Sequence, residues 1–175
     1  MNLFKLNHRG QSLVEFAILL PFFMVIIFGI IEYSHMFMMS LKASNLSRAV
    51  ANATFRDCAF LNDTSMPSCL NTNTIKVKDE ATLIFSDFNT LGTVVTTAFA
   101  KDQAGPPIRL INRQSAGMGG YSSIYNVQNI DTDLMQKHKR VVIGEVIYPY
   151  HAITPLKTFL TLLNIRPVIY EATIY

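Results

Sequence analysis

Residues 8–31, HRGQSLVEFAILLPFFMVIIFGII, decide the fold of this chain. No polar side chain occurs from Phe16 to Ile31, and Glu15 alone interrupts the apolar stretch that starts at Leu13. About 20 predominantly apolar residues are enough to span the hydrocarbon core of a bilayer. We therefore expect a membrane-spanning helix that carries one carboxylate near its N-terminal end.

A cleaved secretory signal is the first alternative for such a stretch. It has a basic start, an apolar core of about 7 to 15 residues and a small-x-small cleavage site. The basic start is present here, but the apolar core is longer, and residues 31–39, IEYSHMFMM, lack the cleavage pattern. The sequence therefore predicts a helix that is retained in the membrane.

The charges on either side of the apolar stretch predict its orientation. Lys5 and Arg9 precede it, Glu32 follows it, and the first lysine beyond it is Lys42. Because positively charged flanks stay on the cytoplasmic side, we expect a cytoplasmic N-terminus. The rest of the chain then lies on the other side of the membrane.

The helix is predicted to continue beyond the membrane. Apolar residues recur at steps of three to five between residues 33 and 53, with polar residues between them, as on one side of a helix. We expect the membrane part at about 13–38 and the whole helix at 11–53. A leader at 1–10 precedes it, and a domain at 54–175 follows.

Composition and motifs argue against catalysis and against nucleic-acid binding. Only 15% of the 175 residues are charged, and the net charge of +3 is not gathered into a basic patch. Neither a phosphate-binding glycine motif nor Gly-x-Ser-x-Gly occurs, and the four histidines have no metal-ligand spacing. We expect no enzyme, no cofactor and no metal site.

The two cysteines, Cys58 and Cys69, lie in the segment DCAFLNDTSMPSC. In a domain outside the cytoplasm they are expected to form a disulfide, which would close a short loop. Two free, partly buried thiols are the alternative.

Several segments of the domain have the composition of strands. Residues 93–101, TVVTTAFAK, and 108–114, IRLINRQ, are predicted to pair as a hairpin with a wide loop. Residues 139–150, KRVVIGEVIYPY, form the clearest strand, and 166–175 form another. The fold class is α+β: a long N-terminal helix, then a small antiparallel-sheet domain with short helices.

Other segments are less definite. Residues 74–79 are predicted as a short strand or turn, and residues 80–88 as a helix or a strand. Residues 115–120, SAGMGG, indicate a turn. A short helix is expected near 130–137, and a short amphipathic segment at 153–163.

Glu145 lies within the clearest strand, on the same face as Val141, Ile143 and Ile147. Two interpretations fit a carboxylate among apolar neighbours: it is tied to a basic partner, or it is exposed at a sheet edge. We expect the second.

The segment GQSLVEF, residues 10–16, resembles the processing site of type IV pilin-like precursors, in which a short basic leader ends in glycine and the fifth residue of the mature chain is glutamate. The resemblance implies cleavage between Gly10 and Gln11 by a prepilin peptidase on the cytoplasmic face. It also implies that Glu15 neutralises the new α-amine of a neighbouring subunit. Gln11 stands where many pilins carry phenylalanine. From the residues alone, Glu15 has a second interpretation, in which its side chain reaches the headgroups.

A second stretch narrows the resemblance. Residues 141–156, VVIGEVIYPYHAITPL, resemble the C-terminal signature of the TadE-like family, minor pilin-like proteins of tight-adherence pilus systems. Residues 14–37 resemble the start of such proteins. The residues that carry the resemblance are Pro21, Gly29, Glu32, Tyr148, Pro149, Tyr150, Thr154, Pro155 and Leu156.

The resemblance implies a minor pilin-like (pseudopilin) subunit that works by packing through its helix. Its expected partners are the prepilin peptidase, other pilin-like subunits, the pilus assembly platform and inner-membrane lipid, and its location is the inner membrane or an extracellular pilus. Two alternatives stay open: a single-pass scaffold of the pilus or secretion machine that remains in the membrane, and an adhesive module.

Overall fold

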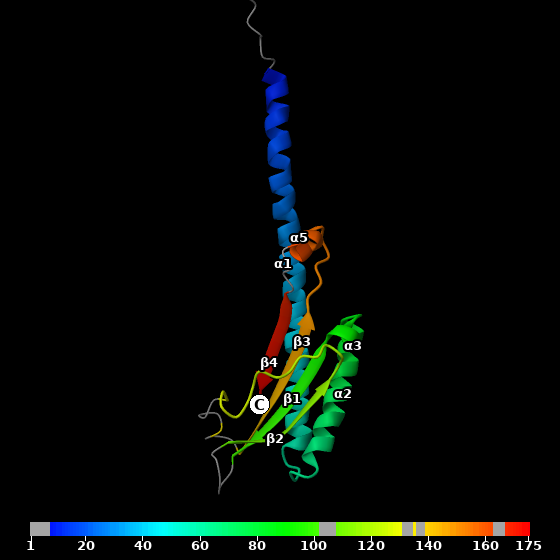
Figure 1. Ribbon diagram of the computed structural model, residues 1–175, viewed down its shortest axis with the longest axis vertical. Helices are drawn as coiled ribbons and strands as arrows, with labels where there is room; N and C mark the ends of the chain where they lie inside the picture. The colour runs from blue at the N-terminus through cyan, green and yellow to red at the C-terminus, as the bar shows by residue number, and fades with distance from the viewer. Residues whose placement is uncertain (1–7, 102–107, 131–134, 136–138, 163–166) are drawn as a thin grey trace, which may run out of the picture. The chain divides into compact units, whose positions relative to one another are not determined.

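The computed structural model describes residues 8–101, 108–130, 135, 139–162 and 167–175. The elements follow the predicted order of a long helix, then helices and strands (Figure 1). Two compact units are present: Met1–Phe37 with His151–Arg166, and Met38–Tyr150 with Pro167–Tyr175. The fold class predicted from the sequence, α+β with an apolar N-terminal helix and an antiparallel sheet, is confirmed.

Helix α1 runs from His8 to Cys58, beyond the end predicted at residue 53. Its residues from Met38 onward belong to the second unit, so the predicted boundary at residue 54 does not separate the compact units. The reason is packing, because the second half of α1 supplies buried side chains to the core of this unit, among them Ala43, Leu46, Val50 and Ala51.

The sheet has four antiparallel strands in the order β2-β1-β3-β4. Their bounds are Thr93–Ala100 for β1, Arg109–Ala116 for β2, Arg140–Pro149 for β3 and Val168–Ile174 for β4. The predicted β1–β2 hairpin is confirmed. Strands β1 and β3 occupy the centre, where every residue of β1 is buried.

One face of the sheet packs against α1 and α2. At Gly144 of β3, an added Cβ would lie 2.5 Å from Cγ1 of Val50 and 2.7 Å from the carbonyl oxygen of Ser47. Only glycine permits this approach of helix to strand. Two hydroxyl pairs also join helices to the sheet, Ser47 with Thr173 and Thr74 with Thr96, each at 2.8 Å.

The other face is covered by the segment that follows β2. Phe99, Ile108, Ile130, Met135, Val141 and Ile143 form a buried cluster, with Tyr125 packed against it. Arg113 of β2 donates hydrogen bonds to Thr97 Oγ1, at 3.1 Å, and to the carbonyl oxygen of Tyr125. The turn predicted at 115–120 begins after β2, with positive φ at Gly117 and Gly120. The short helix predicted near 130–137 lies mostly outside the described residues.

Helix α2, Met66–Ile84, replaces the strand or turn predicted at 74–79. Its buried residues recur every three or four positions, and include Leu70, Thr74, Val77 and Ala81, which is the spacing of one helical face. Pro67 stands in the first turn, where proline is tolerated. The β-branched residues were misleading because this periodicity outweighs their propensity. The other helices within the described residues are α3, Phe88–Leu91, and α5, Leu156–Leu162.

Both interpretations of Glu145 were wrong. Its side chain is fully buried on the central strand β3, away from the sheet edges, and none of the ion pairs within the described residues includes it. Oε1 accepts hydrogen bonds from the Tyr170 hydroxyl, at 2.5 Å, and from the Ile124 amide, at 3.4 Å. Uncharged donors thus satisfy Oε1, whereas Oε2 is buried without a hydrogen-bond partner among the described residues.

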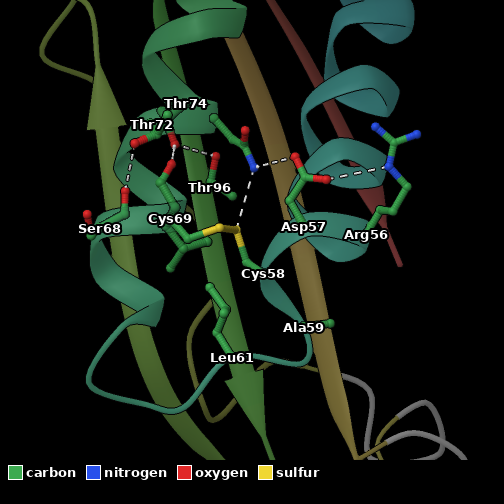
Figure 2. The surroundings of a disulfide bond; sticks show 12 residues. Arg56, Asp57, Cys58, Ala59, Leu61, Ser68, Cys69, Thr72, Thr74 and Thr96 are labelled. Carbon is green, nitrogen blue, oxygen red and sulfur yellow. Dashed lines mark hydrogen bonds and ion pairs between the residues drawn. A yellow bond between two sulfur atoms is a disulfide. The ribbon is translucent and has the colours of Figure 1, made fainter.

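The predicted disulfide is present: Cys58 at the end of α1 is bonded to Cys69 in α2, with 5.8 Å between their Cα atoms (Figure 2). Cys58 is fully buried and clusters with Met66, Leu70, Ala98 and Val142. The bond therefore joins the two helices directly above the sheet.

The loop between α1 and α2 is fixed by Arg140. Its Nη1 donates to the carbonyl oxygens of Ala59, at 2.6 Å, and Leu61, at 2.5 Å. Asp63 pairs with Arg140 and with Arg109, whose hydrogen bond lowers the pKa of that carboxyl below its usual value.

Replacing both cysteines with alanine is expected to lower the free energy of unfolding by about 3 kcal/mol, because the bond restricts the unfolded chain by closing a short loop. The measurement is thermal or urea unfolding of the full-length variant in detergent. The wild type is unfolded in parallel, with and without a reductant that cleaves the disulfide of the unfolded chain. Equal midpoints for the variant and the oxidised wild type would contradict the expected contribution.

Tyr170 predicts a loss of stability at alkaline pH. Burial, and then the hydrogen bond to Glu145, raise the pKa of Tyr170 above its usual value. The stability that the raised pKa contributes is fully present below the pKa of an unfolded tyrosine, which is about 10. That contribution is lost as the pH rises above this value.

Tyr170→Phe is therefore expected to be less stable than wild type at pH 8 and to lose less additional stability between pH 9 and 11. Chemical unfolding at fixed pH values measures both effects. Parallel stability curves for the two proteins would show that Tyr170 does not carry this pH dependence.

Candidate functional site

The outstanding surface of the first unit is the apolar side of α1. Every residue from Leu13 to Ile27 is exposed, and so are Ile30 and Ile31. Phe16 is 62% exposed and Phe22 67%. An apolar surface of this extent marks a site that is covered by lipid or protein. Among the described residues, α1 is the one helix that is long and apolar enough to cross a membrane.

Glu15 lies on this surface, exposed, with apolar residues on both sides in the sequence. A carboxylate within a spanning segment is costly at mid-bilayer and less so near the interface. Its position near the beginning of α1 suits an ionic contact with a cation at the membrane boundary.

Gly10 and Gln11, the predicted cleavage residues, lie in the first turns of α1, which begins at His8. The side chains of residues 8–12 lie outside what the structure describes. Helix ends fray, and glycine is about 1 kcal/mol less favourable than alanine in a helix. The bond after Gly10 is thus placed where the helix opens most easily.

Pro21 and Gly29 both lie inside α1, which continues through them. Around Gly29, an added Cβ would meet nothing within 4 Å. A small residue on an open apolar surface lets a second helix approach closely. This part of α1 is therefore open to helix packing.

Glu32 ends the apolar stretch, and its carboxylate is buried against the segment that follows β3. Oε1 accepts a hydrogen bond from the amide of Ile153, at 3.2 Å, and Oε2 accepts from the amide and hydroxyl of Thr154, at 3.1 and 2.6 Å. We call these three bonds the Glu32 contact. They lie within one unit of the chain.

Sequence reasoning noted Glu32 as a flanking charge and a point of family resemblance, and Thr154 as another point of resemblance, but missed that the two meet. An acid at the end of an apolar helix and a Thr-Pro turn were the available signals. Their distance in the sequence hid the contact.

The tyrosines of the C-terminal signature are structural. The Tyr148 ring packs against Phe85 and Phe88, with centroids 4.6 and 6.0 Å away, and its hydroxyl donates to Asp87 Oδ1 at 2.5 Å. Burial, and then this hydrogen bond, raise the pKa of Tyr148 above its usual value. The amide of Tyr150 donates to the carbonyl oxygen of Pro167 at 2.8 Å. These contacts fix the end of β3, from which the chain continues to the Glu32 contact.

Within the described part of the chain, no group of three or more His, Cys, Asp or Glu side chains is arranged to hold a metal ion. The features that the structure does bring together are an exposed apolar stretch of α1, a carboxylate within it and a second carboxylate directly after it. Their chemistry is that of packing and charge pairing.

Comparison with known proteins assigns the N-terminal part of the chain. A model of the TadE-like protein family matches residues 10–52. The match includes Glu15 and Glu32 and covers most of α1. No curated protein and no solved structure matches the chain. The resemblance inferred from the sequence is thus confirmed for this segment: residues 10–52 match the TadE-like family.

Proposed function

We propose that this chain is a minor pilin-like (pseudopilin) subunit used in the assembly of a tight-adherence type IV pilus. The observation that carries the proposal is the exposed apolar surface of α1, with Glu15 near its start, in a segment that matches TadE-like proteins. The chain enters the inner membrane with its N-terminus in the cytoplasm and its sheet domain in the periplasm. It acts by packing and has no catalytic role.

Processing supplies the cation that the mechanism needs. Prepilin peptidase hydrolyses the peptide bond between Gly10 and Gln11, which leaves an α-amine at Gln11 close to the membrane boundary. Glycine before the bond leaves room for the peptidase and weakens the first turn of α1. In the membrane the amine remains near the headgroups.

Assembly then pairs charges as the helix leaves lipid. The carboxylate of Glu15 forms an ion pair with the protonated α-amine of a neighbouring subunit, so that neither charge is left alone in an apolar environment. The apolar surface between Leu13 and Ile31 exchanges lipid for neighbouring helices and stays away from water throughout. Gly29 permits close approach in that packing.

Cleavage is tested by Gly10→Val, which places a branched side chain next to the bond. The expected result is an uncut chain, detected by intact mass measurement of the membrane-extracted protein; Gly10→Ala is the matched control and is expected to be cut at least in part. A wild-type chain that still begins at Met1 in piliated cells would reject the processed subunit in favour of an uncut membrane scaffold.

The role of Glu15 is tested by Glu15→Gln, which removes the charge and keeps the shape. We expect normal cleavage and a loss of this chain from sheared filaments, measured by immunoblot, while Glu15→Asp retains partial incorporation. Unchanged incorporation of Glu15→Gln would eliminate the charge pair. Absence of the wild-type chain from sheared filaments would favour a scaffold that stays in the membrane.

A further inference from the structure

The Glu32 contact places residues 153 and 154 at a defined level of α1. Glu32 directly follows Ile31, the last residue of the apolar stretch. The carboxylate accepts three hydrogen bonds from Ile153 and Thr154, and both Glu32 and Thr154 are buried. Residues 153 and 154 therefore lie beside the residue at which the apolar stretch ends.

We propose that residues 151–162 are an interfacial membrane segment, held by Glu32 in the headgroup layer of the bilayer that α1 spans. The inference rests on the proposed membrane insertion of α1, and it adds a second, monotopic contact with lipid that the family match does not include. The partner is the lipid surface at the end of the span that follows Ile31.

Several backbone amides of this segment have hydrogen-bond acceptors within the protein, which suits an environment poor in water. Irregular backbone is tolerated at membrane depth only where its polar groups have protein partners. The amides of Ile153 and Thr154 have Glu32 as acceptor, and those of Lys157 and Thr158 donate to the carbonyl oxygens of Thr154 and Pro155, at 3.0 and 3.2 Å. A neutral side chain at position 32 would satisfy fewer of these donors.

Exposed side chains of the unit have the composition of an interface. Ile153 is 61% exposed and Leu162 81%, although each is large and apolar. Tyr33, adjacent to Glu32, is 66% exposed, and tyrosine is enriched at membrane interfaces. Lys157 of α5 is exposed as well, and a lysine stem lies along apolar surface while its ammonium reaches water.

The sequence of α5 is amphipathic in the manner of interfacial helices. Apolar residues stand at 156, 159, 160 and 162, and polar ones at 157, 158 and 161. Such helices lie in the membrane plane with the apolar side about 5–10 Å into the boundary between headgroups and acyl chains. Because the segment is fixed beside the end of the span, no separate encounter with the bilayer is needed.

The experiment labels the full chain with an environment-sensitive fluorophore in phosphatidylcholine nanodiscs, with and without nitroxide on the lipid headgroup. The label sites are Ile153→Cys for the proposal, Ile18→Cys for the span and Phe60→Cys as the control. Phe60 is 88% exposed, so it tests whether apolar exposure alone brings a label into contact with lipid. Non-reducing peptide mapping by tandem mass spectrometry confirms that the Cys58–Cys69 disulfide remains.

We expect blue-shifted emission at position 153 and nitroxide quenching several-fold stronger than at position 60. Equal quenching at 153 and 60, with strong quenching at 18, would overturn the interfacial segment while leaving the span intact. Weak quenching at 18 would instead overturn membrane insertion and the proposed function with it. A blue shift at 153 without nitroxide quenching would identify a protein neighbour and also overturn the proposal.

The role of Glu32 is tested in the same preparation. Glu32→Ala is expected to reduce quenching at position 153 towards the level at position 60, and Glu32→Gln, which keeps one acceptor oxygen, to retain part of it. Unfolding of the sheet domain is followed separately in each variant. Unchanged quenching in Glu32→Ala would show that Glu32 does not hold the segment at the interface.

Discussion

The need to keep the apolar side chains of residues 13–31 away from water is the constraint on which the rest of this structure depends. Each such side chain gains about 1.5–3 kcal/mol on leaving water, and in α1 they are exposed on the protein surface. Lipid and neighbouring helices are the two environments that satisfy them. The proposed membrane insertion and the proposed helical assembly are thus successive solutions to the same physical problem.

The two carboxylates of this helix solve different electrostatic problems. Glu15 is exposed near the beginning of α1, where a mobile cation or amine can approach it. Glu32 is buried, and its oxygens accept hydrogen bonds from two amides and a hydroxyl of residues 153 and 154. The first is suited to a contact between molecules, and the second fixes a contact within one molecule.

In the core of the second unit, a helix and a strand approach each other closely at a glycine. At Gly144 the backbone of α1 approaches β3 so closely that a methyl group would collide with Val50 and with the helix backbone. The disulfide joins the end of α1 to α2 on the same side of the sheet (Figure 2). Together they fix the helix that also forms the apolar surface of the first unit.

The sequence by itself determined the apolar helix, the four strands and the pairing of the cysteines, because these depend on local composition, periodicity and the number of available thiols. It did not determine that residues 74–79 are helical, that Glu145 is buried or that Glu32 accepts hydrogen bonds from residues 153 and 154. Those outcomes depend on partners far away in the chain: a helical face needs a sheet to cover it, and a buried carboxylate needs donors. Only the tertiary structure supplies both.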